Sequence, residues 1–543
     1  MAELDAALAR ISAFLEASLP SFLDAPGAVI GLTDRDRLLG ILPVGNADAF
    51  TGAPVEEETR FEIGSISKSF AALIALQEVD RGTLDLSAPV TEYVPWFRVR
   101  SEFGSAYGPI TTHHLLTHTS GLIMGMDFAD DAIAAVESLA RTSTGFPPGE
   151  RFFYSNDGYK LVGLILERVT DSTIRELLRE RVFAPVGMRR SDPAITFESR
   201  KHVATGHQRI SEDRPPHRKM PLVQAPPIVS TTADGSIIST AADIAAYARM
   251  LLNRGRSDGG ATLLSEVSFD RFTTPVIETE TPGTSYAYGL GVLEVDGHAW
   301  LRHSGGMVGY YALLECDVDA GVGAIMMVNG LAEREPIVRY ALSVLRAWKE
   351  ENDLPEVPPA PDPHAVANAQ ELAGRYRSRG RGVTLRADGG RLLVHADGDE
   401  VALEPDPDAP DRYAVPHPSL DRFALTAERT DGDVVALLHG PDRYVREGTE
   451  ESTDSEAPEA WEQLTGLYRA YNPWFPAFRV YVRGGALFLS AGEGEFRIEA
   501  VGEGEFRVGE SWSPDRVSFG TVLDGRAHVA TYNAHPFWRS FEE

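Results

Sequence analysis

The chain has 543 residues, more than one ordinary domain holds, which predicts two to four domains. Its net charge of −29 disfavours binding to nucleic acid and to anionic membranes, and only five of its 51 basic residues are lysines. Its one cysteine, Cys316, excludes an intrachain disulfide and a zinc–thiolate cluster, and the alternating segment around it predicts a half-buried structural thiol.

The N-terminal segment predicts an amphipathic helix, because apolar residues recur there at helical spacing, at Leu4, Leu8, Ile11 and Leu15. It lacks the basic start and continuous apolar run of a signal peptide, and no later stretch has about 18 uninterrupted apolar residues. We therefore expect a cytoplasmic protein with no membrane partner. Residues 28–33 and 37–43 then predict the two strands of a hairpin.

The next segment predicts a nucleophile and its base on one helical turn. Residues 61–70 read Phe-Glu-Ile-Gly-Ser-Ile-Ser-Lys-Ser-Phe and continue into an apolar run that suits a buried helix beginning at Ser65. Lys68 then lies beside Ser65, where an amine can take the proton of a hydroxyl. The helix N-terminus would offer N–H groups to a developing oxyanion. The alternative is a serine cap followed by a surface lysine.

Two further motifs follow, and each occurs once in the chain: Tyr154-Ser-Asn156 and His303-Ser-Gly305. Tyr154 lies in a loop rich in Pro and Gly, the kind of segment that carries catalytic groups on a scaffold, although a core aromatic is the alternative. His303 precedes glycines that allow a close backbone approach to a ligand, although a satisfied surface histidine is the alternative. Three single motifs in order are far more specific than any one of them.

Three histidines lie close together at His113, His114 and His118, which suggests a metal site. No HExxH pattern or suitably placed carboxylate accompanies them. We therefore expect these histidines to make hydrogen bonds at a helix end and a turn, and we expect neither a metal ion nor a cofactor.

The remaining segments before residue 350 predict packing elements and one long connection. The predicted helices span 159–169, 173–183, 241–252 and 335–349, and a buried strand spans 321–329. Thr240 and Asp243 predict a capping box at the start of the third helix. Residues 189–230, polar and rich in proline, predict a loop that lines or covers the cleft.

A tandem repeat follows a proline-rich spacer at 351–366. Leu372-Ala-Gly-Arg-Tyr376-Arg is echoed 92 residues later by Leu464-Thr-Gly-Leu-Tyr468-Arg. Short alternating strands with Gly and Asp turns predict two antiparallel barrels filled by their own side chains. The predicted domains are 1–350 for catalysis, 367–448 and 461–543 for the barrels, with an acidic linker at 449–460.

On its three motifs the chain resembles the serine β-lactamase and penicillin-binding-protein superfamily, and most nearly its D-aminopeptidases and "CubicO"-type peptidases and esterases. The resemblance covers 26–345 and, more weakly, the C-terminal third. It implies an α/β (α+β) catalytic domain with an antiparallel sheet and helices, followed by two lipocalin-like barrels. It also implies that Ser65 forms an acyl-enzyme, that Lys68 and Tyr154 move protons, and that the Asn156 amide holds the substrate carbonyl region.

His303 takes the place of the lysine in the third superfamily motif, which is usually Lys-Thr-Gly. A neutral imidazole binds a carboxylate more weakly than an ammonium group does, which argues against β-lactamase and DD-carboxypeptidase activity. Gly305 and Gly306 belong to the same stretch. The resemblance implies that the backbone N–H groups of Ser65 and Gly306 hold the oxyanion.

We therefore expect a serine hydrolase that cleaves small peptides or amides, with D-amino-acid substrates among the candidates and a carboxylesterase as the near alternative. An inactive scaffold with ligand-binding barrels is the alternative from another class, and the retention of all three motifs argues against it. The expected partner is a small molecule or short peptide. Nucleic acid is not expected, and a homo-oligomer remains open.

Overall fold

The computed structural model describes residues 2–19, 23–101, 103, 107–125, 131–210, 213–378, 380–407, 409–449, 457–492 and 494–541. The chain divides into two compact units, one made of residues 1–208 and 224–360 and the other of 209–223 and 361–543. The predicted fold class, a mixed α/β unit followed by antiparallel barrels, is confirmed. The predicted domain boundaries stay predictions.

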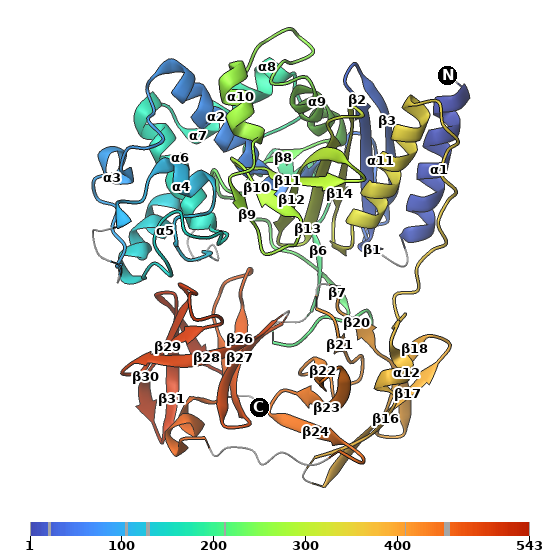
Figure 1. The fold of residues 1–543 in the computed structure, drawn as a ribbon, viewed down its shortest axis with the longest axis vertical. Coiled ribbons are helices and arrows are strands. Elements are labelled where there is room, and N and C mark those ends of the chain that lie inside the picture. The colour runs from blue at the N-terminus through green and yellow to red at the C-terminus, as the bar shows by residue number, and fades with distance from the viewer. Residues whose placement is uncertain are drawn as a thin grey trace. The chain divides into compact units, whose positions relative to one another are not determined.

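The first unit is built on a nine-stranded antiparallel sheet in the order β4-β3-β2-β14-β13-β12-β11-β10-β9 (Figure 1). Its strands are β2 (Gly27–Asp34), β3 (Leu38–Asp48), β4 (Ala53–Pro54), β9 (Ile277–Glu278), β10 (Thr284–Tyr286), β11 (Gly291–Val295), β12 (His298–Met307), β13 (Tyr310–Asp317) and β14 (Val322–Val328). Three short antiparallel pairs accompany it: β1 (Leu23–Asp24) with β15 (Leu331–Ala332), β5 (Phe61–Glu62) with β8 (Ile238–Ser239), and β6 (His207–Arg209) with β7 (Leu222–Gln224).

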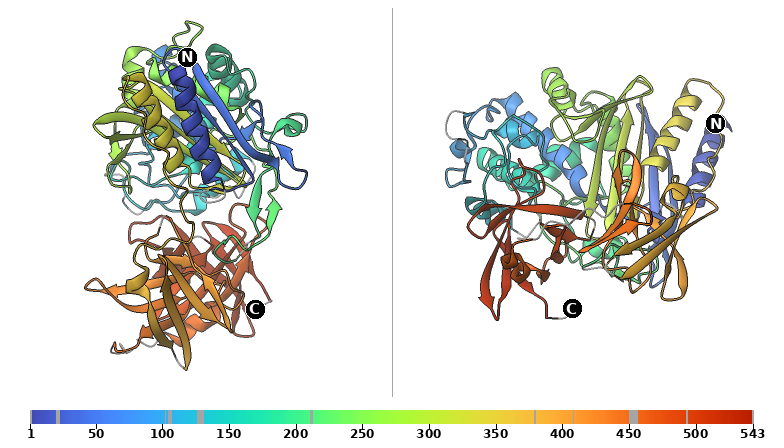
Figure 2. Two further views of the ribbon diagram at one scale, coloured as in Figure 1. Left: turned by 90° about the vertical axis from the view of Figure 1, so that its right-hand side faces the viewer. Right: turned by 60° about the horizontal axis from the view of Figure 1, so that its bottom comes forward.

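Helices cover both faces of this sheet. The helices α1 (Ala2–Ser18) and α11 (Glu335–Lys349) lie side by side over one face, where their apolar sides share a core with β2 and β14 (Figure 2). On the other face, α9 (Ala241–Leu252) approaches β2 closely, because a Cβ added at Gly31 would lie only 2.9 Å from the Ala241 carbonyl oxygen.

The other helices of this unit gather beside the sheet, where α2 and α4 both contact α6 (Figure 1). They are α2 (Ser67–Arg81), α3 (Val90–Tyr93), α4 (Thr112–Leu116), α5 (Ala132–Ser138), α6 (Asn156–Thr170), α7 (Ile174–Leu177), α8 (Ala184–Val186) and α10 (Glu266–Thr273). The predicted helix at 173–183 continues past α7 as a π-helix over Leu178–Phe183. Thr240 caps α9, since its hydroxyl accepts the Asp243 N–H. The other half of the predicted capping box is replaced, because the Asp243 carboxylate accepts from the Arg190 N–H and the Ser191 hydroxyl.

The second unit carries the two strand systems of the tandem repeat. The first is a nine-stranded antiparallel sheet of β16 (Gly374–Ser378), β17 (Arg381–Asp388), β18 (Arg391–Ala396), β19 (Asp399–Ala402), β20 (Glu404–Pro405), β21 (Arg412–Ala414), β22 (Leu425–Thr430), β23 (Asp433–His439) and β24 (Asp442–Arg446). The second is a closed eight-stranded barrel of β25 (Gly466–Arg469), β26 (Ala477–Arg483), β27 (Ala486–Ala491), β28 (Gly494–Gly502), β29 (Glu505–Val508), β30 (Arg516–Leu523), β31 (Arg526–Tyr532) and β32 (His535–Arg539).

The repeat seen in the sequence is a repeat of contacts as well. The Tyr376 hydroxyl donates to the Leu372 carbonyl at 2.7 Å, and the Tyr468 hydroxyl donates to the Leu464 carbonyl at 2.8 Å. In each system the strand carrying that tyrosine pairs with the last strand, β24 or β32. Apolar and aromatic side chains are packed against one another in both systems, as expected of barrels filled by their own residues.

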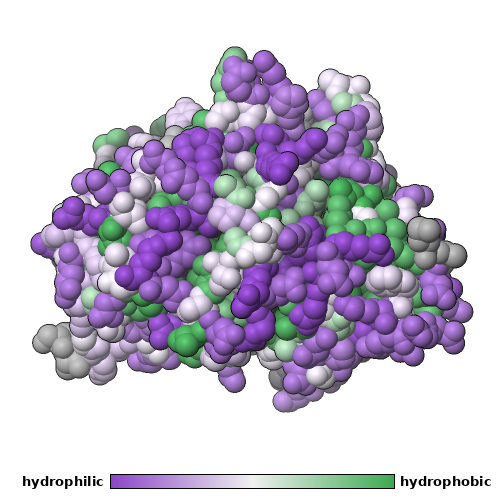
Figure 3. All heavy atoms as spheres, turned by 90° about the horizontal axis from the view of Figure 1, so that it is seen from above, coloured by the Kyte–Doolittle hydropathy of each residue, from purple (hydrophilic) through white to green (hydrophobic). Residues whose placement is uncertain are grey.

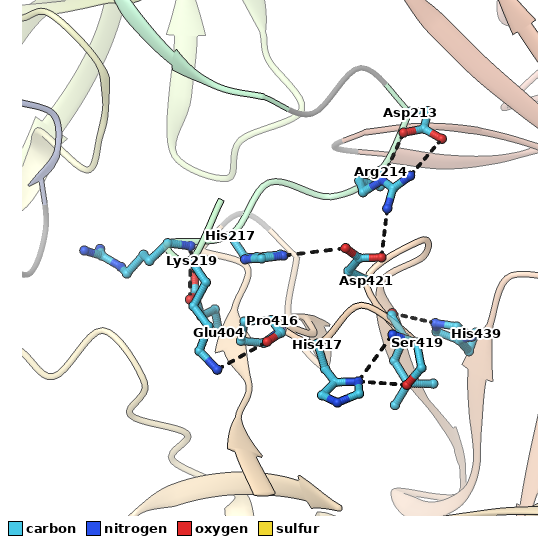
Figure 4. A network of polar contacts seen from close by, with 12 residues as sticks. Asp213, Arg214, His217, Lys219, Glu404, Pro416, His417, Ser419, Asp421 and His439 are labelled. Atoms are coloured by element: carbon cyan, nitrogen blue, oxygen red, sulfur yellow. Dashed lines mark hydrogen bonds and ion pairs between the residues drawn. The ribbon is translucent and has the colours of Figure 1, made fainter. Parts of the chain in front are cut away.

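Residues 209–223 belong to the second unit, although the sequence treats them as part of one long loop of the catalytic domain. Arg214 donates to the Asp421 carboxylate at 3.0 Å (Figure 4). The neighbouring Asp213 pairs with Arg479 of β26. The Arg218 N–H donates to the Glu404 carboxylate at 3.0 Å. Ion pairs to both strand systems therefore hold this segment.

Hydrophilic side chains cover most of the face drawn in Figure 3, and hydrophobic residues are scattered among them. Within the ranges given above, no helix is both long enough and apolar enough to span a bilayer.

Asp213→Asn tests the ionic anchor of residues 209–223. The Asp213 and Arg479 side chains are only 8 % and 12 % exposed, so the substitution leaves a buried guanidinium poorly compensated. We expect the free energy of unfolding of the second unit to fall by about 1–3 kcal/mol, and trypsin to cleave faster after Arg218, which Lys219 follows.

The control is Asp388→Asn, which removes one carboxylate from the exposed ion pair with Arg386. It should leave both the urea midpoint and the cleavage rate unchanged. Equal effects of the two substitutions would contradict the anchoring role of Asp213.

Candidate active site

Ser65 lies in a short 3₁₀ turn, Gly64–Ile66, that runs directly into α2. The sequence predicts the helix to begin at Ser65, and the regular α-helix begins two residues later. The turn is held from one side by the β5–β8 pair and by the Ile63 N–H, which donates to the Ile237 carbonyl at 3.0 Å. The nucleophile candidate therefore lies on a fixed backbone at the entry to a buried helix.

Lys68 is fully buried and donates hydrogen bonds to three acceptors. Its Nζ lies 2.9 Å from Ser65 Oγ, 2.8 Å from Asn156 Oδ1 and 2.7 Å from the Asp234 carbonyl oxygen. Three acceptors match the three N–H bonds of an ammonium group. In this arrangement Lys68 donates to Ser65, so it must first lose a proton before it can act as the base.

Tyr154 and Asn156 approach Lys68 from the start of α6. The Lys68 Nζ lies 4.9 Å from the centre of the Tyr154 ring. The Asn156 amide accepts from Lys68 and donates one N–H to the Gly125 carbonyl at 3.1 Å, and its second N–H has no acceptor among the described residues. Ser155 caps the helix by accepting the Gly158 N–H. The first two predicted motifs are thus brought together around one ammonium group.

The third motif reaches the same place through backbone contact. A Cβ added at Gly305 would lie 1.9 Å from the Ile63 carbonyl oxygen and 3.3 Å from the Ser65 nitrogen. A Cβ added at Gly64, whose φ is +53°, would lie 2.5 Å from the Gly306 nitrogen. The two glycines let β12 pack directly on the turn that carries Ser65, and no residue with a side chain fits there.

The His303 ring uses both of its nitrogens inside the protein. Nδ1 lies 2.5 Å from the Ser304 carbonyl oxygen, which can only accept, so Nδ1 carries the proton. Nε2 lies 2.9 Å from the Tyr286 hydroxyl, which therefore donates to it. Burial and the charge of Lys68 lower the pKa of His303 to about 3, so the ring is neutral near pH 7.

Several residues of this site were not predicted from the sequence to belong to it. His118 contacts Tyr154, Tyr286 contacts His303, and the Asp234 carbonyl binds Lys68. Asp234 lies in the turn before β8, and its bond to Lys68 is made by a backbone oxygen, which no side-chain pattern indicates. Nothing in the sequence distinguishes Tyr286 from other core aromatics.

The three neighbouring histidines make the hydrogen bonds expected of a helix end and a turn. The Thr111 N–H donates to His114 Nδ1 at the start of α4, and His113 Nδ1 lies 2.6 Å from the Tyr288 hydroxyl. In the described part of the chain, no three His, Cys, Asp or Glu side chains are grouped as metal ligands.

The family model described as Beta-lactamase matches residues 15–346, which is more than half of the chain. The chain belongs to the β-lactamase family. The chain is 30 % identical over 372 residues to penicillin-binding protein 4 of Amycolatopsis lactamdurans, covering 65 % of this chain and 94 % of the relative. The predicted membership of the β-lactamase and penicillin-binding-protein superfamily, a family of serine hydrolases, is therefore confirmed.

Two further similarities of this β-lactamase family member extend past the catalytic unit. A D-aminopeptidase of Cereibacter sphaeroides is 24 % identical over 509 residues, covering 82 % of this chain and 92 % of the relative. The octameric penicillin-binding protein homologue from Pyrococcus abyssi superposes with a TM-score of 0.60 at 24 % identity, covering 81 % of this chain and all of that one. The latter similarity shows the fold alone.

Gly305→Ala tests the packing of β12 on the Ser65 turn. The added methyl group would overlap a backbone carbonyl, so strand and turn must separate and the Gly306 N–H must move away from Ser65. We expect the rate of Ser65 labelling by a fluorophosphonate to fall by about 100-fold or more. Gly306→Ala is the folding control, because its Cβ would meet only the Tyr311 ring at 3.7 Å. Wild-type labelling by a folded Gly305→Ala protein would contradict this packing.

Glu62, three residues before Ser65, gives a second prediction. Both of its carboxylate oxygens are buried without a hydrogen-bond partner among the described residues, and burial raises its pKa from 4.5 to about 8. The folded chain therefore binds more protons than the unfolded chain between these values, and the free energy of unfolding falls as pH rises through this window. Glu62→Gln should be more stable than wild type at pH 9 by roughly 2–5 kcal/mol.

The measurement for Glu62→Gln is the urea midpoint at intervals from pH 5 to pH 9. Near pH 5 the two proteins should be similar, because the protonated carboxyl resembles the amide. Glu56→Gln, at an exposed position, is the control and should keep the pH dependence of wild type. If the urea midpoint of Glu62→Gln varied with pH as that of wild type does, the raised pKa of Glu62 would be contradicted.

Proposed function

We propose that this chain is a serine hydrolase that cleaves small peptides or amides through an acyl-enzyme on Ser65. The name of the relative from Cereibacter sphaeroides, D-aminopeptidase, supports a peptide or amide substrate. The observation that carries the proposal is the hydrogen bond from buried Lys68 to Ser65, within an arrangement that also holds Tyr154, Asn156 and the glycines of β12. A bare SxxK pattern would not support it, whereas this convergence does.

In the proposed reaction, Ser65 Oγ forms a bond to the substrate carbonyl carbon as its O–H bond breaks. The proton passes to Tyr154 or Lys68 and then to the leaving amine, whose bond to the carbonyl carbon breaks. Which of the two residues takes the first proton stays open. The backbone N–H groups of Ser65 and Gly306 would hold the oxyanion, and water would then hydrolyse the ester.

The substrate class follows from the neutral His303. Its neutral ring has both nitrogens engaged, so it presents no cation to a substrate carboxylate. This supports substrates without a carboxylate beside the scissile bond, such as D-amino-acid amides and short peptide amides. A carboxylesterase is the second candidate, because esters also lack that carboxylate and the same acyl-enzyme accepts them. A homo-oligomer is proposed from the octameric homologue alone.

The test compares wild type with Ser65→Ala and Lys68→Met. Both variants should lose fluorophosphonate labelling, and kcat should fall by at least about 10⁴-fold for Ser65→Ala. Lys201→Met, whose side chain is 64 % exposed, should label like wild type. Equal labelling of wild type and Ser65→Ala would favour the inactive scaffold instead.

The substrate test uses D-alanine p-nitroanilide, p-nitrophenyl acetate and D-alanyl-D-alanine. We expect kcat/KM to be higher for the anilide than for the dipeptide, whose C-terminal carboxylate has no cationic partner. Turnover of the ester with none of the anilide would establish the esterase alternative, and a preference for the dipeptide would contradict the argument from His303.

A further inference from the structure

His118 contacts three consecutive residues: Phe153, Tyr154 and Ser155. Its carbonyl accepts the Phe153 N–H at 2.8 Å, and its ring lies 4.1 Å from the Tyr154 ring at 32°. Its Nδ1 accepts the Ser155 N–H at 3.0 Å. One fully buried residue thus holds the backbone before Tyr154 through its carbonyl, and the Tyr154 ring and the backbone after it through its imidazole.

We propose that His118 is the positioning residue of Tyr154, which holds the phenol against Lys68. The inference rests on the proposed hydrolase activity, because it concerns a group proposed to move protons in it. His118 itself touches neither Ser65 nor a substrate in this proposal. It acts through Tyr154 alone.

Three features of the surroundings support this role. The other ring neighbours of His118 are Tyr286 at 4.9 Å, Tyr159 at 5.1 Å and Phe152 at 5.7 Å, so an aromatic cage fixes its orientation. Since Nδ1 accepts the Ser155 N–H, the proton of the neutral ring is on Nε2. Burial and the charge of Lys68 lower the pKa of His118 well below its ordinary value, which keeps Nδ1 free to accept.

The backbone at this position favours a particular test variant. His118 has φ +56°, a left-handed conformation that Asn adopts more readily than most residues. His118→Asn keeps an acceptor oxygen near the position of Nδ1 but removes the ring that lies against Tyr154. We expect kcat for a nitrophenyl ester to fall by about 10- to 100-fold, while KM changes by less than about 2-fold.

A double-mutant cycle separates positioning from general damage. If His118 acts only through the phenol, adding His118→Asn to Tyr154→Phe should change the rate of fluorophosphonate labelling by less than about 2-fold. His118→Phe is the second variant, which keeps a ring but leaves the Ser155 N–H without an acceptor. It should lower the thermal midpoint more, and kcat less, than His118→Asn does.

The matched control is His114→Asn, because His114 also accepts a backbone N–H through Nδ1 but lies in the cap of α4. It should keep wild-type kcat. Equal losses from His118→Asn in the wild-type and Tyr154→Phe backgrounds would overturn the inference, as would wild-type kcat in a folded His118→Asn protein. Labelling of wild type no faster than of Ser65→Ala would overturn the proposed function, and this inference with it.

Discussion

The structure of the site depends on one buried ammonium group and the three acceptors around it. Lys68 contributes no exposed surface, so its charge must be compensated by neighbouring dipoles. The acceptors come from the Ser65 turn, the start of α6 and the turn before β8, which lie far apart along the chain. A lysine in this position therefore requires three separate segments to stay in contact, and the geometry around Ser65 follows from that requirement.

Burial, and after it the same charge, determine which neighbours ionise. Together they lower the pKa of both buried histidines, His118 and His303, and so keep one nitrogen of each ring free to accept a hydrogen bond. His118 accepts from Ser155, and His303 accepts from Tyr286. The cation thus indirectly stabilises the hydrogen bonds that hold Tyr154 and β12, and the site behaves as one coupled electrostatic unit rather than as a set of independent side chains.

Local patterns predicted much of the fold. The helices α1, α9 and α11 and the strands of the first hairpin follow directly from hydrophobic spacing and from the Thr240 cap. The repeat at Tyr376 and Tyr468 was also visible, because identical local contacts require similar local sequences. The place of residues 209–223 was not visible, because the ion pairs of Asp213 and Arg214 join it to residues about 200 or more positions away. Sequence spacing carries no information on such pairs.

In the candidate site, too, some residues could be predicted from local patterns and others could not. Ser65, Lys68, Asn156 and the β12 glycines belong to short motifs, and their convergence could be predicted from motif order. His118 belongs to a pattern that was interpreted as structural, and its hydrogen bonds are indeed structural ones. Its contact with the Tyr154 ring depends on the left-handed backbone conformation of His118, which cannot be predicted from the sequence. Residues that support a catalytic group are thus harder to predict than the group itself, because they need a suitable shape and no special chemistry.

Two independent features disfavour an anionic substrate. The net charge of −29 opposes its approach at a range of several ångströms, limited by salt to about one Debye length of 8–10 Å. At contact distance, His303 is neutral and the three N–H bonds of Lys68 are already engaged. The net charge and the local hydrogen bonding therefore both support the proposed preference for neutral or cationic substrates. A free amino group on the substrate is consistent with both, which is the physical basis for preferring amino-acid amides.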